Sequence, residues 1–410
     1  MAAVSPASLA IPLQQHSAAA APTTRIISID AFRGLVMFLM LAEVMRLWTV
    51  RDAFPASRFW AFVAFNTTHV PWQGCSLHDL IQPAFSFLVG AALPFSIASR
   101  STRGQSFARM LAHAIWRSVA LILLGIFLRS LERSGTYWTF EDTLTQIGLG
   151  YTFLFLLAFA SRRLQAGLFA AILVGFWAAF VLYPLPPAGF DYTQVGVPAN
   201  WPHLYTGFLA HFNKNSNLSW AFDVWFLNLF PRDAPFHFNE GGWSTLSFVP
   251  TLATMLFGLW SGQWLKTPRS TDEKLEGLAA AGVALALAGL ALQWLHICPI
   301  VKRIWTSSYT LYSGGLVILM LAGFHAAIER QGWKRWSFPL LVIGANSIAV
   351  YVMSWTMEHF VAAALLRHLG PSPFAILGAP FEPVLRGIGI LVVFWSILFW
   401  MYRRRIFIRI

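Results

Sequence analysis

Long apolar runs recur along the chain, and short polar segments separate them. An α-helix of about twenty residues crosses the roughly 30 Å hydrocarbon core of a bilayer, and most of the runs have about this length. The pattern predicts about ten membrane-spanning helices (ten to eleven), near residues 31–50, 79–99, 110–130, 142–161, 164–184, 243–265, 276–296, 304–327, 337–356 and 383–402. The apolar segment 361–377 is interrupted by glycine and proline, which favours a short interfacial helix or an eleventh partial span.

The composition agrees with a membrane-embedded fold. Of the 410 residues, 57% are hydrophobic and only 11% are charged, which is far too apolar for a soluble globular protein. The net charge of +12 could suit a nucleic acid, but the basic residues cluster at the ends of the apolar runs. In the predicted topology, these basic residues lie mainly on the same side of the membrane as the N-terminus. We therefore expect an all-α integral membrane protein with both termini cytoplasmic and no nucleic-acid partner.

The chain divides into a tail and one transmembrane domain. Residues 1–24 are rich in Ala, Ser and Pro without a sustained apolar core, which predicts a disordered cytoplasmic tail. Residues 25–410 form the transmembrane domain, with a long extracytoplasmic loop at about 185–242. The aromatic and amide residues of this loop suit either sugar binding or an interfacial belt. Cys75 and Cys298 are expected on the same outer side, so the sequence leaves a disulfide between them open.

Polar side chains also fall within the predicted spans, where each needs a partner or a polar cavity. Asp30 and Arg33 share one helical face, which predicts an ion pair, and the Arg33 guanidinium could also bind a phosphate. Glu43 lies deeper, where Arg46 could pair with it. Comparable groups are His113, Arg117, Glu141, Asp142, Thr145, Gln146, Glu240, Asn346 and Ser347. Together they predict a wet or ligand-filled interior, although each alone could simply bridge two helices.

The segment THVPWQGCSLHDLIQP places His69, His78 and Asp79 at the start of an apolar run. A neutral imidazole there could take a proton from an amine or hydroxyl, or accept an acyl group itself, and Asp79 or Glu43 could fix its tautomer. A structural role is the commoner one for a lone histidine in a membrane loop. Cys75 and His78 have a spacing that metal ligands use, but no second pair completes a site, so no metal is expected.

Six motifs follow one another in an order that resembles the heparan-alpha-glucosaminide N-acetyltransferase family and its bacterial relatives. They are SIDAFRGLVMFLML, HVPWQGCSLHDLIQPAFSFLVGAALPFS, TQIGLGY, NEGGWSTLSFVPTLATMLFGLWSGQWL, PIVKRIWTSSYTLYSGG and GANSIAVYVMS. The resemblance extends over nearly the whole chain from about Arg25. It implies transmembrane acetylation, in which acetyl-CoA enters a tunnel from the cytosol and its acetyl group passes to an amino sugar or glycan on the far side.

The resemblance also implies roles for single residues. His69 matches the family's active-site histidine and Asp79 its aspartate, and with Glu43 they are the predicted catalytic residues. The predicted acetyl-CoA-binding residues are Arg33, Gln146 and Asn346, and the predicted acceptor-binding residues are Trp72, Glu240 and Trp243. The chain departs from the animal enzymes where Glu43 replaces Asn, where Thr145 and Gln146 replace a Gln-Arg pair, and where FNEG replaces DPEG.

The leading prediction is an acetyl-CoA-dependent acyltransferase of a bacterial inner membrane. The alternative is a multi-pass transporter or flippase for a sugar or amphiphile, in which the same polar groups line the path. We find no internal repeat, and helix-breaking residues lie mainly outside the predicted spans, which favours the enzyme. A non-catalytic scaffold would leave the buried carboxylates and histidines without a purpose. The sequence leaves open N- versus O-acylation, an acetylated-enzyme route and the oligomeric state, a homo-oligomer included.

Overall fold

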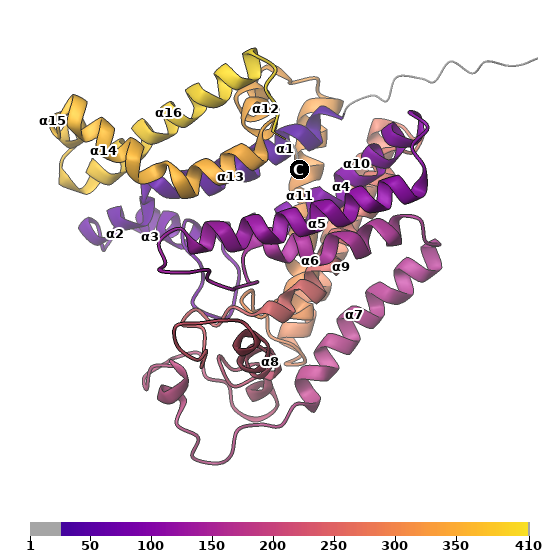
Figure 1. Ribbon diagram of the computed structural model, residues 1–410, viewed down its shortest axis with the longest axis vertical. Helices are drawn as coiled ribbons and strands as arrows, with labels where there is room; N and C mark the ends of the chain where they lie inside the picture. The colour runs from indigo at the N-terminus through magenta and orange to yellow at the C-terminus, as the bar shows by residue number, and fades with distance from the viewer. Residues whose placement is uncertain (1–25, 409–410) are drawn as a thin grey trace, which may run out of the picture.

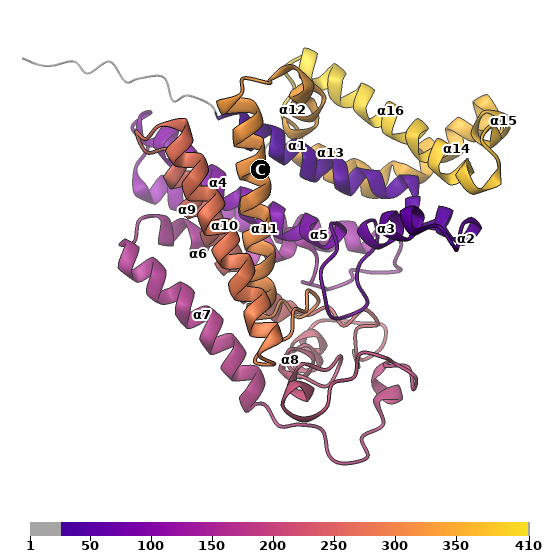
Figure 2. The same ribbon diagram turned by 180° about the vertical axis from the view of Figure 1, so that it is seen from behind.

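The computed structural model describes residues 26–408, so the predicted tail at 1–24 lies outside the described residues. Regular structure in this part is helical, apart from one isolated antiparallel bridge between Gln73 and Val301 (Figures 1 and 2). The α-helices are α1 (Ile27–Leu41), α2 (Val50–Ala53), α3 (Arg58–Asn66), α4 (Ile81–Ser101), α5 (Phe107–Ser130), α6 (Thr143–Ala158), α7 (Arg162–Leu182), α8 (Leu218–Phe226), α9 (Phe248–Leu265), α10 (Thr271–Trp294), α11 (Ser307–His325), α12 (Phe338–Gly344), α13 (Ser347–Thr356), α14 (Glu358–Leu369), α15 (Ser372–Ala375) and α16 (Glu382–Arg403).

Several helical segments can span a membrane. Within the described residues, seven are long and apolar enough, and they contain α4, α5, α7, α9, α10, α11 and α16. The bent pair α12 and α13 makes an eighth if it forms one span. Helices α1 and α6 are shorter, with 15 and 16 residues. The prediction of an all-helical, polytopic membrane protein is confirmed, while the count of about ten and the cytoplasmic termini stay predictions.

The prediction of one continuous helix over 31–50 is wrong. Helix α1 begins earlier, at Ile27, and ends at Leu41, where a 3-10 turn (Ala42–Met45) follows. Arg46 then adopts φ 47°, a left-handed conformation that a right-handed helix cannot continue through. The turn redirects Glu43, whose side chain contacts His78 in place of the expected partner Arg46.

The predicted span at 337–356 is also interrupted. Helices α12 and α13 meet at an angle of 67° around Ala345 and Asn346. The Asn346 side chain donates a hydrogen bond to the Ile406 carbonyl and accepts one from the Ile408 N–H, both at 3.0 Å. The C-terminal segment therefore stabilises the break between α12 and α13 through these two hydrogen bonds. The segment 361–377 forms parts of the short helices α14 and α15 and no span.

Helices α4 and α9 cross with their backbones in contact. A Cβ atom added at Gly258 would collide with the Phe87 carbonyl, and one added at Gly90 would collide with the Met255 carbonyl. Only glycine permits this approach without displacement of the helices. The contact fixes α4, which directly follows the 3-10 turn with His78 and Asp79, against the centre of the bundle.

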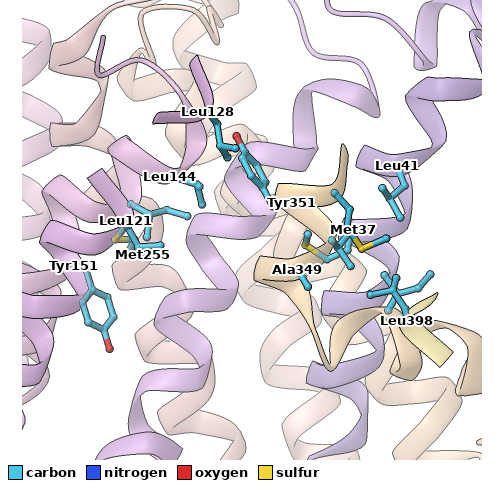
Figure 3. Packing of buried hydrophobic residues seen from close by; sticks show 14 of the residues in the cluster. Met37, Leu41, Leu121, Leu128, Leu144, Tyr151, Met255, Ala349, Tyr351 and Leu398 are labelled. Carbon is cyan, nitrogen blue, oxygen red and sulfur yellow. The ribbon is translucent and has the colours of Figure 1, made fainter. Parts of the chain in front are cut away.

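A large apolar cluster fills the bundle beside this crossing. Figure 3 shows side chains that converge from α1, α5, α6, α9 and α13, including Met37, Leu121, Leu144, Met255 and Tyr351. All five are buried. Four of them, all except Met255, also line an internal cavity. The core therefore shapes the cavity wall directly.

The connection between α7 and α9 folds into an ordered unit at the lower end of Figures 1 and 2. It contains α8 and four 3-10 turns, Tyr192–Val195, Gly207–Phe212, Leu227–Leu229 and Thr245–Ser247. Its buried amides bind backbone: Asn213 accepts a hydrogen bond from the Tyr205 N–H at 2.7 Å, and Asn215 donates to the carbonyls of Val195 and Asn239 at 2.8 Å. These bonds account for a fixed loop conformation in a segment with little regular structure.

Candidate active site

The buried carboxylate of Asp79 holds the imidazole of His69. Asp79 lies in the 3-10 turn (His78–Leu80) that leads into α4, and 1% of its side chain is exposed. Its Oδ2 accepts hydrogen bonds from the N–H groups of Val70 at 3.2 Å and Ser76 at 3.0 Å. Its Oδ1 lies 2.8 Å from Nδ1 of His69. An ionised Asp79 places the His69 proton on Nδ1, so Nε2 is the nitrogen left to exchange a proton.

Lys302 completes this buried group of charges. It lies in the connection between α10 and α11, and 3% of its side chain is exposed. Its Nζ is 3.3 Å from Oδ1 of Asp79 and 3.2 Å from Nδ1 of His69. The sequence prediction did not include Lys302. A signal for it is present nonetheless, because a lysine between apolar residues in PIVKRIW requires a partner.

The surroundings keep the His69 imidazole neutral. Desolvation lowers the pKa of His69 below its ordinary value of 6.5, and the charges of Lys302 and Arg303 lower it further, while Asp79 opposes the shift. The exposed part of the side chain, 37%, faces a cavity. A histidine with a lowered pKa is unprotonated at neutral pH and can therefore act as a base.

His78 connects His69 to Glu43. The two imidazole rings lie 4.4 Å apart, and Nε2 of His78 is 3.3 Å from Oε1 of Glu43. Trp243 presents its ring to His69 from another side at 5.5 Å. Four of the predicted residues, His69, Asp79, Glu43 and Trp243, are thus brought together, with Glu43 reaching His69 through His78.

Two neighbouring cavities lie in the bundle, and the first of them adjoins this group. The first, of about 530 Å³, is lined by His69, His78, Glu43, Trp243 and Lys302 among others. The second, of about 770 Å³, is lined by parts of α1, α4, α5, α6 and the α12–α13 break. We call them the outer and the inner cavity after the predicted orientation.

The outer and inner cavities share a boundary. Phe85, Thr143 and Tyr351 line both of them. These three side chains therefore lie at the boundary between the two neighbouring spaces, which we call the constriction. A flexible chain that passes the constriction would connect the inner cavity with His69.

The wall of the inner cavity is basic. It carries four guanidinium groups and one imidazole, with a single carboxylate among its described lining residues: Arg33, Arg100, Arg103, Arg117, His113 and Asp30. Arg33 and Asp30 lie 3.2 Å apart, which confirms the predicted ion pair. The excess positive charge suits a ligand with several phosphate groups.

The remaining predicted site residues have contacts that point to structural roles. Gln146 is fully buried and its Nε2 donates to the carbonyls of Phe140 and Thr245. Asn346 binds the C-terminal backbone, as described above, and neither amide lines a cavity. Trp72 is fully buried and donates to the Phe212 carbonyl at 3.1 Å, and Glu240 is exposed outside both cavities. Their predicted binding roles stay predictions that these contacts do not favour.

The described residues hold no cluster of three or more His, Cys, Asp or Glu side chains arranged for a metal ion. Cys75 and Cys298 are both free thiols, so the disulfide that the sequence left open does not form in this structure. Burial raises the pKa of each thiol, which makes both poor nucleophiles at neutral pH. Among the side chains of this group, the His69 imidazole is the better candidate for chemistry.

These features define an integral membrane protein with a histidine–carboxylate pair that faces an internal cavity. The chain is 23% identical to human heparan-alpha-glucosaminide N-acetyltransferase over 375 residues, which cover 82% of this chain and 53% of the human protein. It is 22% identical to the mouse enzyme over 378 residues, 82% of this chain and 54% of the mouse protein. No protein-family model matches the chain.

The comparisons establish a distant family relationship with these N-acetyltransferases. The chain spans about half the length of the curated relatives it matches. At this distance the relationship alone does not assign an activity to the chain. It leaves the donor, the acceptor and the individual site residues to be argued from the structure.

Replacing Lys302 by Gln should raise the pKa of His69, because a nearby positive charge is removed while Asp79 stays. Burial continues to lower the pKa of His69 in this variant, so we expect the pKa to rise without losing the whole downward shift. Diethyl pyrocarbonate reacts with neutral imidazole, so its rate of reaction with His69 at several pH values, followed by mass spectrometry of the peptide, measures the pKa.

The Lys302→Arg variant retains the positive charge, so its His69 should titrate as in the wild type. Exposed His368 of α14 provides an internal standard, whose rate of reaction with the reagent should be the same in every variant. Thermal unfolding is recorded for each variant, because an unpaired buried carboxylate costs about 3–5 kcal/mol. A folded Lys302→Gln protein whose His69 titrates as in the wild type would contradict the role assigned to Lys302.

Proposed function

We propose that this protein is a membrane acetyltransferase that takes the acetyl group from cytosolic acetyl-CoA and passes it to an amino sugar or glycan on the extracytoplasmic side. The observation that carries the proposal is the meeting of a basic inner cavity and an outer cavity beside His69. The distant relationship to N-acetyltransferases gives independent support.

Acetyl-CoA suits the inner cavity because its phosphates are multiply charged and its pantetheine arm is slender. Arg100 and Arg103 lie at the end of α4 that is expected at the cytoplasmic surface, and Arg117 lies deeper on α5. Guanidinium groups bind phosphates through paired hydrogen bonds. The arm would pass Phe85, Thr143 and Tyr351 and bring the thioester towards His69.

His69 supplies the proton transfer. Nε2 takes a proton from the acceptor amine as its nitrogen attacks the thioester carbonyl carbon, and the carbon–sulfur bond then breaks. The proton passes to the CoA thiolate, which leaves as the thiol. Asp79 holds the ring and offsets the charge of the imidazolium. In the alternative route Nε2 itself accepts the acetyl group first, so both routes use the same atom.

The first test compares wild-type protein with His69→Ala. Purified protein in detergent is incubated with radiolabelled acetyl-CoA and a panel of amino sugars, and acetylated sugar is separated and counted. Loss of the base should lower the rate by about 100-fold or more, while CoA binding persists. The matched control is His368→Ala, which removes an exposed histidine outside both cavities; full turnover by His69→Ala would exclude the mechanism.

A second test addresses the phosphates. The double variant Arg100→Gln, Arg103→Gln should weaken CoA binding about fivefold, which corresponds to about 1 kcal/mol for two partly exposed charges. Calorimetric titration of CoA measures the change. The control variant Arg162→Gln, Arg163→Gln removes the same charge at the start of α7, outside the inner cavity. Equal weakening by both pairs would indicate a nonspecific charge effect and contradict the proposed site.

A third test addresses the constriction. Thr143→Phe should fill it and slow acetyl transfer on the order of 100-fold by displacing the thioester from His69, with little effect on the binding of the CoA phosphates. Thr143→Val has nearly the size of threonine and should remain active. The two variants are compared by kcat for transfer and by Kd for CoA. Normal kcat in Thr143→Phe would show that the donor takes another path.

The rival function is transport, and the experiments separate the two. A transporter would bind a solute in either cavity without consuming acetyl-CoA. In that case neither the wild type nor the His69→Ala variant would turn over acetyl-CoA. The His69–Asp79–Lys302 group favours the enzyme, because a fixed neutral base is a catalytic requirement and transport alone does not need it.

A further inference from the structure

We propose that the acceptor is a protonated amine with no sulfate, phosphate or carboxylate group close to it, and that the acidic wall of the outer cavity selects it. This inference rests on the proposed function and names the charge of its second substrate. It follows from the side chains that face His69 across the outer cavity, and it excludes a strongly anionic glycan at that position.

The described lining of the outer cavity carries excess negative charge. Its carboxylates belong to Glu43, Glu132, Glu141, Asp142 and Glu358. Its basic groups belong to Arg129, Arg133 and Lys302. Lys302 is already paired with Asp79. Arg129 rests on the ring of Trp355 at 4.9 Å and also acts on Glu141 and Asp142, while Arg133 rests on the ring of Tyr137 at 4.7 Å. The protein therefore leaves several carboxylates in this cavity with too few cations.

One of these carboxylates, Glu43, lies near the base, and a second, Glu358, acts on Glu43. Glu43 contacts His78, whose ring is 4.4 Å from that of His69. Burial is the main effect that disfavours the ionised form of Glu43, and Glu358, at the start of α14, adds a smaller repulsion to it. A cation between Glu43 and Glu358 would relieve this repulsion. It would also place an ammonium group within a short distance of the His69 imidazole.

A third carboxylate lies deeper in the same wall. Glu141 accepts a hydrogen bond from Asn239 at 3.0 Å. Burial raises the pKa of Glu141 although Arg129 and Asn239 act in the opposite direction, so the protein alone does not balance its charge. Asp142 is different, because it caps α6 through the N–H groups of Leu144 and Thr145. The argument for a cationic ligand therefore uses Glu43, Glu141 and Glu358.

The contrast with the inner cavity strengthens the assignment. The inner cavity presents an excess of guanidinium groups, and the outer cavity presents an excess of carboxylates. The phosphates of CoA are thus held back from the outer cavity, and a cation is held back from the inner one. Each substrate is kept on its own side of the constriction, with only the acetyl-bearing arm between them.

The reaction balances with an ammonium substrate. The bound R–NH3⁺ releases one proton to the aqueous side, and its nitrogen then attacks the thioester carbonyl carbon. The carbon–sulfur bond breaks, and the second proton passes through Nε2 of His69 to the thiolate. The products are the acetamide, CoA thiol and one proton. The carboxylates bind the cation before it loses its proton and release the neutral amide afterwards.

The test uses matched acceptors. Glucosamine is compared with glucosamine 6-sulfate, which has the same reacting amine and one added anionic group. We expect kcat/KM for glucosamine to exceed that for the sulfate by about tenfold or more, which corresponds to about 1.4 kcal/mol, and the difference should shrink at high ionic strength. Equal values, or a preference for the sulfate, would overturn the inference.

Variants locate the effect in the cavity wall. Glu141→Gln, Glu358→Gln removes two charges of the outer cavity but keeps Glu43, and should raise KM for glucosamine while discrimination against the sulfate falls towards unity. The charge-matched control Asp52→Asn, Glu276→Gln changes two exposed residues outside both cavities and should retain the preference. Unchanged discrimination in the first variant would contradict selection by this wall.

Failure of the inference can be told apart from failure of the proposed function. If no amine is acetylated and no CoA is consumed, the proposed acetyltransferase activity is wrong, and so is the inference about the charge of the acceptor. If acetyl transfer occurs but sulfated and unsulfated amines react equally, the enzyme assignment stands and only the cationic acceptor is wrong.

Discussion

The ionised carboxylate of Asp79 is the group on which the rest of the site depends. Backbone N–H groups, the His69 imidazole and the Lys302 ammonium surround its oxygens, and the hydroxyl of Tyr309 donates to its main-chain carbonyl at 2.7 Å. A buried carboxylate without such partners would be destabilised by several kcal/mol. Since Tyr309 and Lys302 come from sequence more than 200 residues away, the loop before α4 and the turn before α11 have to assemble together.

Helix α4 transmits this constraint to the interior. Asp79 precedes its first turn, Phe85 reaches the constriction one turn further on, and Arg100 and Arg103 lie at its far end and in the turn that follows. The glycine contact with α9 prevents α4 from sliding, because any added side chain there would meet backbone. A single rigid helix therefore fixes the spacing between the base, the narrow passage and the basic mouth of the inner cavity.

The sequence predicts contacts that are local and misses those that are distant. The Asp30–Arg33 pair follows from helical spacing, and the His69–Asp79 pair from a motif within one loop. Lys302 was missed, because no periodicity relates residues so far apart. Glu43 was expected to pair with Arg46 or with an imidazole, and the sequence did not single out His78. Gln146 and Asn346 look like ligand groups in an apolar run, yet backbone carbonyls and a broken helix account for both. Apolar patterning predicts the helical membrane class, but the first predicted span ends early, at Leu41, and the ninth is interrupted at Ala345 and Asn346.

The charges of the two cavities also bear on the choice between transfer and transport. A transported solute has to occupy both cavities in turn, and a solute of either charge would be attracted by one wall and repelled by the other. The opposite arrangement of charge is an obstacle to such passage. For a transferase it is an advantage, because an anionic donor and a cationic acceptor would each be concentrated on one side. Only a neutral acetyl-bearing arm then has to cross between Phe85, Thr143 and Tyr351, and the neutral His69 lies in the outer cavity where the arm would end.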